Sequence, residues 1–252
     1  MPRDGFTPEG DLRRLNAQFD GDPQGALNVA LSGDLGRVAL VSSFGADSVV
    51  LLHMLAQTHP DAPVLFVDTM MLFAETLEYQ HEVAKTLKLQ NLRVIRPTRE
   101  AIFAHDPDGV LHLTDADACC TLRKTQALDA ALDGFDGWIT GRKRSQGGVR
   151  TALDVFEADG PRIKVNPLAG WDTARVAKYI DTHHLPRHPL VAQGYPSIGC
   201  APCTGPVAPG EDPRAGRWRG HAKTECGIHV RDGRVIRGPA AQNIPSKQQA
   251  AQ

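Results

Sequence analysis

Apolar runs typical of buried strands alternate with longer helical segments in the first hundred residues. The runs cover 38–44, 63–69 and 92–98, and the segments with helical spacing between them cover 46–59 and 75–89. Strands that alternate with helices of this length form βαβ units, whose right-handed crossovers give a parallel sheet. The predicted fold class is therefore α/β, with an open, mainly parallel sheet flanked by helices.

Further strands and one more helix are expected up to about residue 184, and regular structure is sparse after that point. A fourth strand is expected at 137–141, a hairpin at 155–165 that turns at Asp159-Gly160, and a capped helix at 172–184. We divide the 252 residues into an α/β domain at 1–210, a basic C-terminal segment at 211–237 that we expect to be mobile, and a polar tail at 238–252 that we expect to be disordered.

Charge is unevenly distributed along a chain whose net charge is only -1. Four Lys/Arg and no acid lie within 141–150, and seven Lys/Arg against two acids lie within 214–237. This layout suits a small anionic ligand and argues against a nucleic-acid partner, which would favour a basic surface overall. No stretch approaches the length of a membrane span, and the N-terminus lacks the apolar run of a secretory signal. We therefore expect a cytoplasmic protein with no membrane partner.

The segment that joins the first predicted strand to its helix is rich in small and hydroxyl residues, SSFGADS at 42–48. Small residues let backbone N–H groups approach a ligand, and the start of the helix adds partial positive charge, so the segment can bind an anion. It is not a Walker loop, and the chain has no Gly-x-Gly-x-x-Gly. A turn that merely caps the helix is the alternative, but ligands of open parallel sheets bind at the carboxyl ends of strands.

Four of the five cysteines form two pairs, Cys119-Cys120 and Cys200-x-x-Cys203. Two thiolates separated by two residues can converge on one metal centre, and a second pair completes four ligands. Structural zinc, a thioredoxin-like redox pair and chance thiols are the alternatives. Neighbouring thiolates are awkward ligands for one tetrahedral ion, whereas each can bind a different iron of a [4Fe-4S] cluster, so the pattern favours the cluster over zinc.

Two further residues near these motifs carry chemistry. Lys124 follows Cys119 by five residues. It is either a solvated helix lysine or a cation beside both the cluster and an anionic substrate. Cys226 stands between Lys223 and His229 in the basic segment, where positive charge would stabilise a thiolate. We interpret Cys226 as a candidate nucleophile, with an ordinary exposed thiol as the alternative.

Five motifs in this order resemble the assimilatory adenylyl-sulfate (APS) reductases of the bacterial sulfonucleotide reductase family, whose loop is that of the adenine nucleotide α-hydrolase superfamily. The motifs are SFGADS at 43–48, Cys119-Cys120, TGRKRSQ at 140–146, GYPSIGC at 194–200 and ECGIH at 225–229. By position, the resemblance implies a [4Fe-4S] cluster on Cys119, Cys120, Cys200 and Cys203, with Lys124 between cluster and substrate. It also implies a nucleotide site at Ser42, Ser43, Gly45 and Ser48, and phosphosulfate contacts from Arg144, Arg214, Arg217 and His229.

The resemblance implies the reaction as well. Cys226 would attack the sulfur of APS, expel AMP and carry a thiosulfonate, which thioredoxin or glutaredoxin would reduce to release sulfite in sulfate assimilation and cysteine biosynthesis. Homo-oligomers occur among such reductases and are a further expectation. The chain departs from the family at Gly205, where many relatives have arginine, and at Asp47-Ser48, where glutamate also occurs.

Three other functions stay open at this point. A 3'-phosphoadenylyl-sulfate (PAPS) reductase would run the same chemistry on a substrate with one more phosphate. A tRNA-thiolating, ATP-dependent enzyme of the superfamily would need an RNA-binding surface and a Ser-Gly-Gly-x-Asp-Ser loop, whereas Phe44 and Ala46 stand here. A nucleotide-binding module with structural zinc would leave Cys226 unexplained. For the reductase, we expect the cluster to act electrostatically, because Cys226 and thioredoxin already account for two electrons.

Overall fold

One six-stranded sheet organises the chain, of which the computed structural model describes residues 8–219, 225, 230–231 and 234–235. The strands lie in the order β3 (Leu92–Ile95), β2 (Val64–Val67), β1 (Val38–Ser42), β4 (Gly137–Ile139), β6 (Arg162–Val165) and β5 (Phe156–Asp159). All neighbours pair in parallel except β5 and β6, which form the predicted hairpin. Gly160 has a φ of +63° in that turn, a conformation that favours glycine. The α/β prediction is confirmed.

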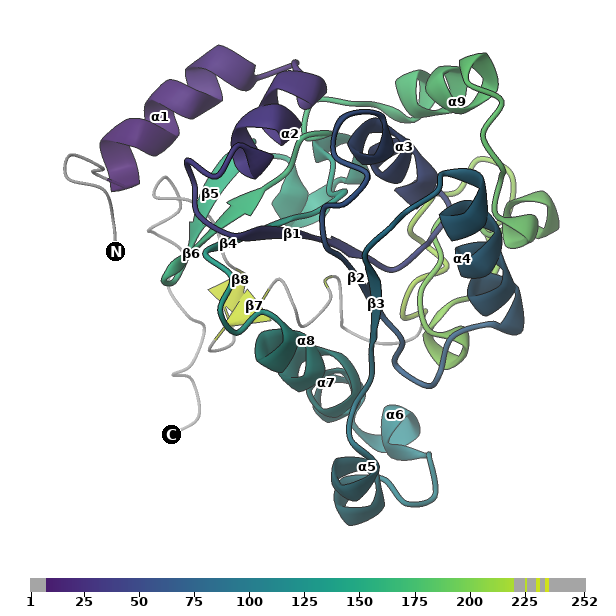
Figure 1. Cartoon of the computed structure of the whole chain (residues 1–252). Helices are drawn as coiled ribbons and strands as arrows, with labels where there is room; N and C mark the ends of the chain where they lie inside the picture. The colour runs from purple at the N-terminus through teal and green to yellow at the C-terminus, as the bar shows by residue number, and fades with distance from the viewer. Residues whose placement is uncertain (1–7, 220–224, 226–229, 232–233, 236–252) are drawn as a thin grey trace, which may run out of the picture.

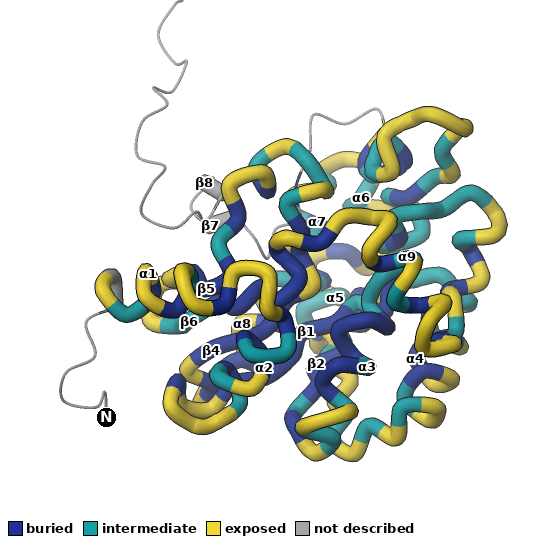
Figure 2. Tube along the Cα trace, turned by 90° about the horizontal axis from the view of Figure 1, so that it is seen from above, coloured by how far each residue is buried: buried dark blue, intermediate teal, exposed yellow. Residues whose placement is uncertain are grey.

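Helices cover both faces of the sheet (Figure 1). One face packs against α1 (Pro8–Phe19), α2 (Pro23–Leu31), α3 (Ser48–Thr58), α4 (Ala74–Thr86) and α9 (Thr173–Thr182), which form the larger apolar core. The other face packs against α8 (Gln126–Ala131), whose Leu128 meets Leu65 and Trp138 in a smaller core. Strands β1 and β2 are buried along their whole length (Figure 2), which explains why they occur as continuous apolar runs.

A chain of short helices connects β3 to β4 and positions the first cysteine pair. It consists of α5 (Arg99–His105), α6 (Leu111–Thr114), α7 (Ala116–Cys120), a π-helical turn at Thr121–Thr125, and α8. The Asp115 side chain caps α7 by accepting hydrogen bonds from the backbone N–H groups of Asp117 (3.0 Å) and Ala118 (2.8 Å). This cap fixes the start of the helix that ends in Cys119 and Cys120.

The rest of the described chain is irregular apart from short elements. These are 3-10 turns at Arg144–Gln146, Gly148–Arg150, Pro189–Gln193 and Ala201–Cys203, and the ribbon of β7 (Val230–Arg231) and β8 (Arg234–Val235). The predicted tail at 238–252 lies outside the described residues. Within the described part of the chain, no helix is long and apolar enough to cross a membrane.

Candidate active site

The β1–α3 loop is tightly curled and partly buried. The Ser42 hydroxyl accepts a hydrogen bond from the Phe44 N–H at 3.1 Å. Phe44 has a φ of +48°, which is unusual for a residue with a side chain, and its buried ring packs edge-on against Phe66. A Cβ on Gly45 would lie 3.2 Å from the carbonyl oxygen of Ile198, so this glycine allows a close approach of two chain segments. The loop is therefore held in one shape by packing.

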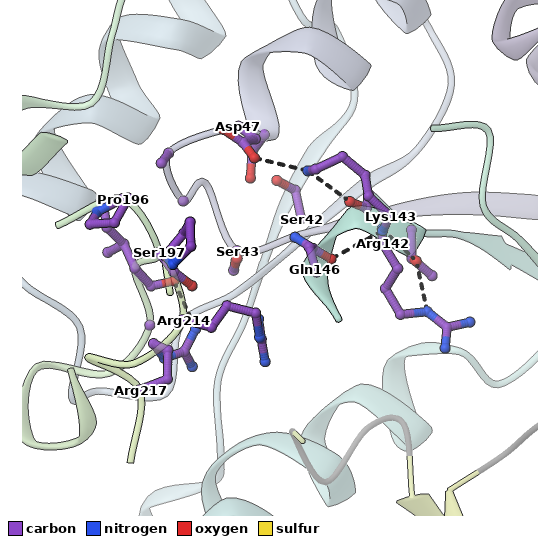
Figure 3. Close-up of a pocket in the computed structure, with 18 of the residues that line it drawn as sticks. Ser42, Ser43, Asp47, Arg142, Lys143, Gln146, Pro196, Ser197, Arg214 and Arg217 are labelled. Carbon is purple, nitrogen blue, oxygen red and sulfur yellow. Dashed lines mark hydrogen bonds and ion pairs between the residues drawn. The ribbon is translucent and has the colours of Figure 1, made fainter. Parts of the chain in front are cut away.

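A cavity of about 350 Å³ opens in front of this loop, at the carboxyl ends of β1, β2 and β4. Parallel α/β sheets bind their ligands at this edge. Figure 3 shows the loop on one side of the cavity and the basic side chains around it. Among the residues predicted for the site, the following line the cavity: Ser42, Ser43, Gly45, Ser48, Lys124, Arg214, Arg217, Cys120, Cys200 and Cys203. Cys226 and His229 lie outside the described residues.

Two basic residues just after β4 line the cavity and are held by acidic side chains. The ammonium of Lys143 lies 2.9 Å from the carboxylate of Asp47 in the β1–α3 loop (Figure 3). The guanidinium of Arg142 pairs with Glu157 and donates to the side-chain oxygen of Asn166 at 3.1 Å. Burial lowers the pKa of Arg142, but an arginine stays protonated in proteins. Both cations are thus fixed in place before any ligand binds.

Arg144 does not line the cavity in this structure, and its contact with the phosphosulfate stays a prediction. Its guanidinium donates to the carbonyl oxygen of Leu153 at 2.7 Å and to the carboxylate of Asp20 at 3.0 Å, and the side chain does not line the cavity. The members of the basic run at 141–150 that line the cavity are Arg142, Lys143 and Arg150. No periodic pattern exists in this irregular segment, so nothing in the sequence indicated which side chains face inward.

Arg150 lines the cavity and forms a buried ion pair with Glu225. Its Nε and Nη2 each donate to one carboxylate oxygen of Glu225 at 2.6 Å. Arg214 approaches the same carboxylate, with its Nη2 3.9 Å from Oε1. Arg150 and Glu225 lie 75 positions apart, and the sequence alone indicates no role for either residue. An acid inside a basic stretch, such as Glu225 within 214–237, indicates an ion pair, but the sequence does not identify which cation is its partner.

Arg217 lies beside the Cys-x-x-Cys segment. It forms an isolated β-bridge with Thr204, its Nη1 donates to the carbonyl oxygen of Ile198 at 3.4 Å, and its guanidinium stacks on the ring of Trp218 at 4.5 Å. Its Nε is buried and has no hydrogen-bond partner among the described residues. A buried N–H without an acceptor is costly, so this group suits an anion brought by a ligand.

The two cysteine pairs come together on one side of the cavity. Burial raises the pKa of the Cys119 thiol to about 11, the positive charge of Arg123 lowers it, and the charges of Cys200 and Cys203 raise it. Cys119 therefore lies close enough to these three residues for their charges to change its pKa, although Cys119 itself does not line the cavity. The hydroxyl of Thr69 lies 3.2 Å from Sγ of Cys200, within hydrogen-bonding distance. The π-helical turn begins directly after the first pair, and such turns are frequent at functional sites.

The cysteines that the structure describes are not arranged as the ligands of a single metal ion. In the described part of the chain, no three His, Cys, Asp or Glu side chains are grouped so that they could hold one metal ion. A tetrahedral zinc with Zn–S bonds of about 2.3 Å would bring its ligand sulfurs to within roughly 3.8 Å of one another. A [4Fe-4S] cluster makes no such demand, because each cysteine binds a different iron.

Residues 37–206 match the phosphoadenosine phosphosulfate reductase domain family. The chain belongs to this family. The match covers the sheet, the β1–α3 loop and all four paired cysteines. It confirms the family that the five motifs indicated, and with it the prediction that the protein is an enzyme.

Curated relatives in the phosphoadenosine phosphosulfate reductase family include both substrate types. An adenosine 5'-phosphosulfate reductase of Chelativorans sp. (strain BNC1) is 54% identical over 197 residues, which cover 78% of this chain and 80% of the relative. One from Mesorhizobium japonicum is 54% identical, with 77% and 76% covered. A phosphoadenosine 5'-phosphosulfate reductase of Gloeobacter violaceus is 39% identical, with 87% and 93% covered.

The fold also agrees with a solved member of the phosphoadenosine phosphosulfate reductase family. The phosphate complex of phosphoadenylyl-sulfate reductase from Candida auris superposes with a TM-score of 0.68 at 27% identity and covers 81% of this chain and 98% of that one. An FMN adenylyltransferase of Candida glabrata shares the fold at a TM-score of 0.54 and 15% identity. The sheet and its helices are therefore those of the family.

Proposed function

We propose that this chain reduces APS to sulfite and AMP, as a step of sulfate assimilation and cysteine biosynthesis. The observation that carries the proposal is one cavity lined at once by the nucleotide-type loop, by basic side chains and by Cys120, Cys200 and Cys203. The two relatives that are 54% identical and are named adenosine 5'-phosphosulfate reductases support the choice of substrate.

The cavity offers separate surfaces for the two parts of APS. Backbone N–H groups of the β1–α3 loop and the start of α3 suit the nucleotide, because both direct partial positive charge toward a ligand. Arg214, Arg217 and Lys124 line the same cavity, and Arg217 lies beside the Cys-x-x-Cys segment. Guanidinium groups bind phosphate and sulfate oxygens through paired hydrogen bonds and stay charged throughout. We therefore assign Arg214 and Arg217 to the phosphosulfate group, and Lys124 to a position between the substrate and the paired cysteines.

Cys226 is the nucleophile of the proposed reaction. Its thiolate attacks the sulfur of APS, an S–S bond forms, and the bond from that sulfur to the bridging phosphate oxygen breaks. AMP leaves with the electron pair, and Cys226 carries a thiosulfonate. A thiolate of thioredoxin or glutaredoxin then attacks Sγ of Cys226, and sulfite leaves with the electron pair of the S–S bond. The second thiol of the reductant closes its disulfide and restores the Cys226 thiolate, so two electrons pass from dithiol to sulfur.

The paired cysteines fit a [4Fe-4S] cluster, which we propose as the cofactor. The donor set consists of four thiols from two segments, one of which ends a capped helix and the other of which is fixed by the β-bridge between Leu72 and Cys200. Arg123 supplies positive charge that favours the thiolate of Cys119. When bound, the cluster supplies an electrostatic influence near the sulfate, because Cys226 and the dithiol already transfer both electrons. A dithiol reductant and reduced thiols are features of the cytoplasm, the location we propose.

The test uses protein purified without oxygen and then incubated with APS in the absence of any dithiol. We expect intact-mass analysis to show one added SO₃ group on wild type and none on the Cys226→Ser variant, and subsequent addition of thioredoxin to release sulfite. An adduct on another residue would reject Cys226 as the nucleophile. An adduct on neither protein, with iron present, would favour the tRNA-thiolating enzyme, and zinc in place of iron would favour the nucleotide-binding module.

PAPS reduction is the second candidate, because the relative from Gloeobacter violaceus and the fold neighbour from Candida auris are named for that substrate. The same adduct assay, repeated with PAPS over a range of concentrations, separates the two. We expect the half-saturating concentration to be lower for APS. A lower value for PAPS would reassign the substrate while leaving the role of Cys226 unchanged.

A further inference from the structure

Helices α3 and α9 pack against each other (Figure 1), and both line the cavity. Leu51 of α3 and Val176 and Ile180 of α9 are among the lining residues, and they also belong to the larger apolar core. Because each helix contributes side chains to the wall, the distance between the two helices influences the width of the cavity.

His53 on α3 and Tyr179 on α9 join the two helices through a hydrogen bond. Nδ1 of His53 lies 2.9 Å from the Tyr179 hydroxyl. On the other side of the ring, Nε2 of His53 lies 3.3 Å from the side-chain nitrogen of Gln57. An amide nitrogen can only donate, so the proton of neutral His53 is assigned to Nδ1, from where it is donated to the Tyr179 oxygen. Each ring nitrogen of His53 thus has its own partner.

His183 completes the cluster at the end of α9. Its ring centroid lies 4.8 Å from that of His53 and 4.2 Å from that of Tyr179. The next residue, His184, has a φ of +50°, and its N–H donates to the carbonyl oxygen of Asp181 at 3.2 Å, which ends the helix with a left-handed cap. His183 is exposed, whereas His53 is half-buried. A proton on His53 would therefore add a second positive charge next to the His183 ring.

The surroundings of His53 oppose its protonation. Burial lowers the pKa of His53, and a positive charge on His183 lowers it further. Burial raises the pKa of the Tyr179 hydroxyl, so this group stays protonated and neutral at and below pH 7. Helix α2 also packs on α3 and carries no titratable side chain. The remaining titratable groups of α3, α9 and their ends are Asp172, which caps α9, Arg175, which lies over the Trp171 ring, Asp181, which pairs with Arg187, the exposed Lys178 and His184, and His59 beyond the end of α3.

We propose that His53 and Tyr179 are positioning residues that hold the α9 wall of the cavity against α3, and that protonation of His53 releases this wall. The proposal rests on the nucleotide site of the proposed function. Protonation places a new N–H at Nε2, opposite the N–H groups of Gln57, and a second charge beside His183. Rotation of the Gln57 amide relieves the first conflict but not the second. Separation of the helices lets His53 bind its proton more readily, so acid favours the open wall.

The contact is tested first by hydrogen exchange of the α9 peptide 173–183 without ligand, at pH 7.5 and pH 5.5, with correction for intrinsic exchange rates. We expect protection of this peptide in wild type to fall at least threefold at the lower pH, while that of the α1 peptide 9–19 is unchanged. Tyr179→Phe removes only the hydroxyl, and its α9 peptide should already exchange at least threefold faster than wild type at pH 7.5.

Two histidine variants separate the charge of His53 from its hydrogen bond. His53→Asn places an uncharged N–H donor near the position of Nδ1, so protection of its α9 peptide should fall less than 1.5-fold between the two pH values. His81→Gln is the matched control, because His81 is exposed on α4 and does not line the cavity. Its α9 peptide should respond to pH as in wild type.

Nucleotide affinity is measured next as the dissociation constant of AMP, by equilibrium dialysis at the same two pH values. We expect the constant to rise at least threefold more in wild type than in His53→Asn on going to pH 5.5. The ionisation of AMP itself affects both proteins equally and cancels in this comparison.

Three results would overturn the proposal or its basis. An α9 peptide in wild type that does not respond to pH, or one in His53→Asn that responds as strongly as wild type, would reject the role of His53. Equal pH dependence of AMP affinity in the two proteins would show that the contact stabilises α9 without controlling the cavity. If wild type binds no AMP at either pH, the nucleotide site of the proposed function fails, and the exchange measurement still decides whether His53 holds α9.

Discussion

Replacing Arg123 with methionine should strongly lower the free energy of unfolding, because Arg123 holds the short helices that carry Cys119 and Cys120. Arg123 lies in the π-helical turn, and its Nε (3.0 Å) and Nη2 (2.6 Å) both donate to the carboxylate of Asp106. Both side chains are at most 5% exposed. Asp106 also accepts from the backbone N–H of Leu111 at 2.9 Å. Burial raises the pKa of Asp106, but the hydrogen bonds and Arg123 outweigh burial, so the pKa lies below its usual value and the acid is charged.

The size of the effect follows from burial of the pair. Removing one partner of a buried ion pair leaves the other charge uncompensated, which costs about 3–5 kcal/mol of the free energy of unfolding. A protein of this length loses roughly 2–4 °C of melting temperature per kcal/mol, so Arg123→Met should melt about 6–20 °C lower. Adding Asp106→Asn should recover more than half of the loss, because the amide oxygen still accepts from Leu111 and no buried charge remains.

The assay is urea unfolding followed by circular dichroism at pH 7, under anaerobic conditions and with iron content measured in parallel. Arg14→Met is the control, since Arg14 pairs with Asp11 at 3.3 Å but its side chain is 67% exposed. Exposed pairs of this kind contribute at most about 1 kcal/mol. A loss of less than about 1 kcal/mol in Arg123→Met, or a double variant no more stable than the single one, would show that the unpaired Asp106 charge does not carry this cost.

Three further predictions follow from single contacts. Burial lowers the pKa of His188 from 6.5 to about 4. Between these pH values only the unfolded chain binds this proton, so the free energy of unfolding should rise with pH across the window. Urea unfolding of His188→Gln should show a rise that is smaller by roughly 3 kcal/mol. A Cβ on Gly216 would lie 2.1 Å from the carbonyl oxygen of Gly205, whereas a Cβ on Gly205 would lie 4.0 Å from the carbonyl oxygen of Gly216. Gly216→Ala should therefore lower the free energy of unfolding by about 2 kcal/mol, and Gly205→Ala should leave it unchanged. Arg217→Gln should weaken equilibrium binding of APS about tenfold, because a charged donor to the anion is lost. Arg144→Gln should change that affinity less than threefold, because Arg144 does not line the cavity. Equal effects of the two variants would contradict the orientation of these side chains.

The features that could be predicted from sequence are those with a local physical signature. Buried parallel strands occur as continuous apolar runs, so the runs at 38–44 and 63–69 predict β1 and β2 and extend at most two residues beyond either end of each strand. The small residues at 42–48 indicated a loop that approaches a ligand, and the structure gives it that shape through the positive φ of Phe44 and the close approach of Gly45. In each case the signal and its structural cause lie within the same few residues.

The features that could not be predicted depend on partners far apart in the chain. Arg144 was assigned to the site, but Asp20, 124 positions away, draws its guanidinium outward. Arg150 and Glu225 were not assigned, because their pairing is set by the path of the irregular segments after β4 and after Arg217. Arg144 and Arg150 are therefore oriented differently although both are basic and close in sequence, because tertiary packing determines which of them lines the cavity.

Three ion pairs at the cavity explain how a site with so many cations can fold before substrate arrives. Asp47 compensates Lys143, Glu157 compensates Arg142, and Glu225 compensates Arg150. Each pair fixes a cation in place, so the positive potential is organised in advance and needs little rearrangement when an anion binds. Arg217 is different, because its buried Nε has no acceptor among the described residues. The bound phosphosulfate would supply that acceptor, which is why affinity for substrate should depend on Arg217 more than on the paired cations around it.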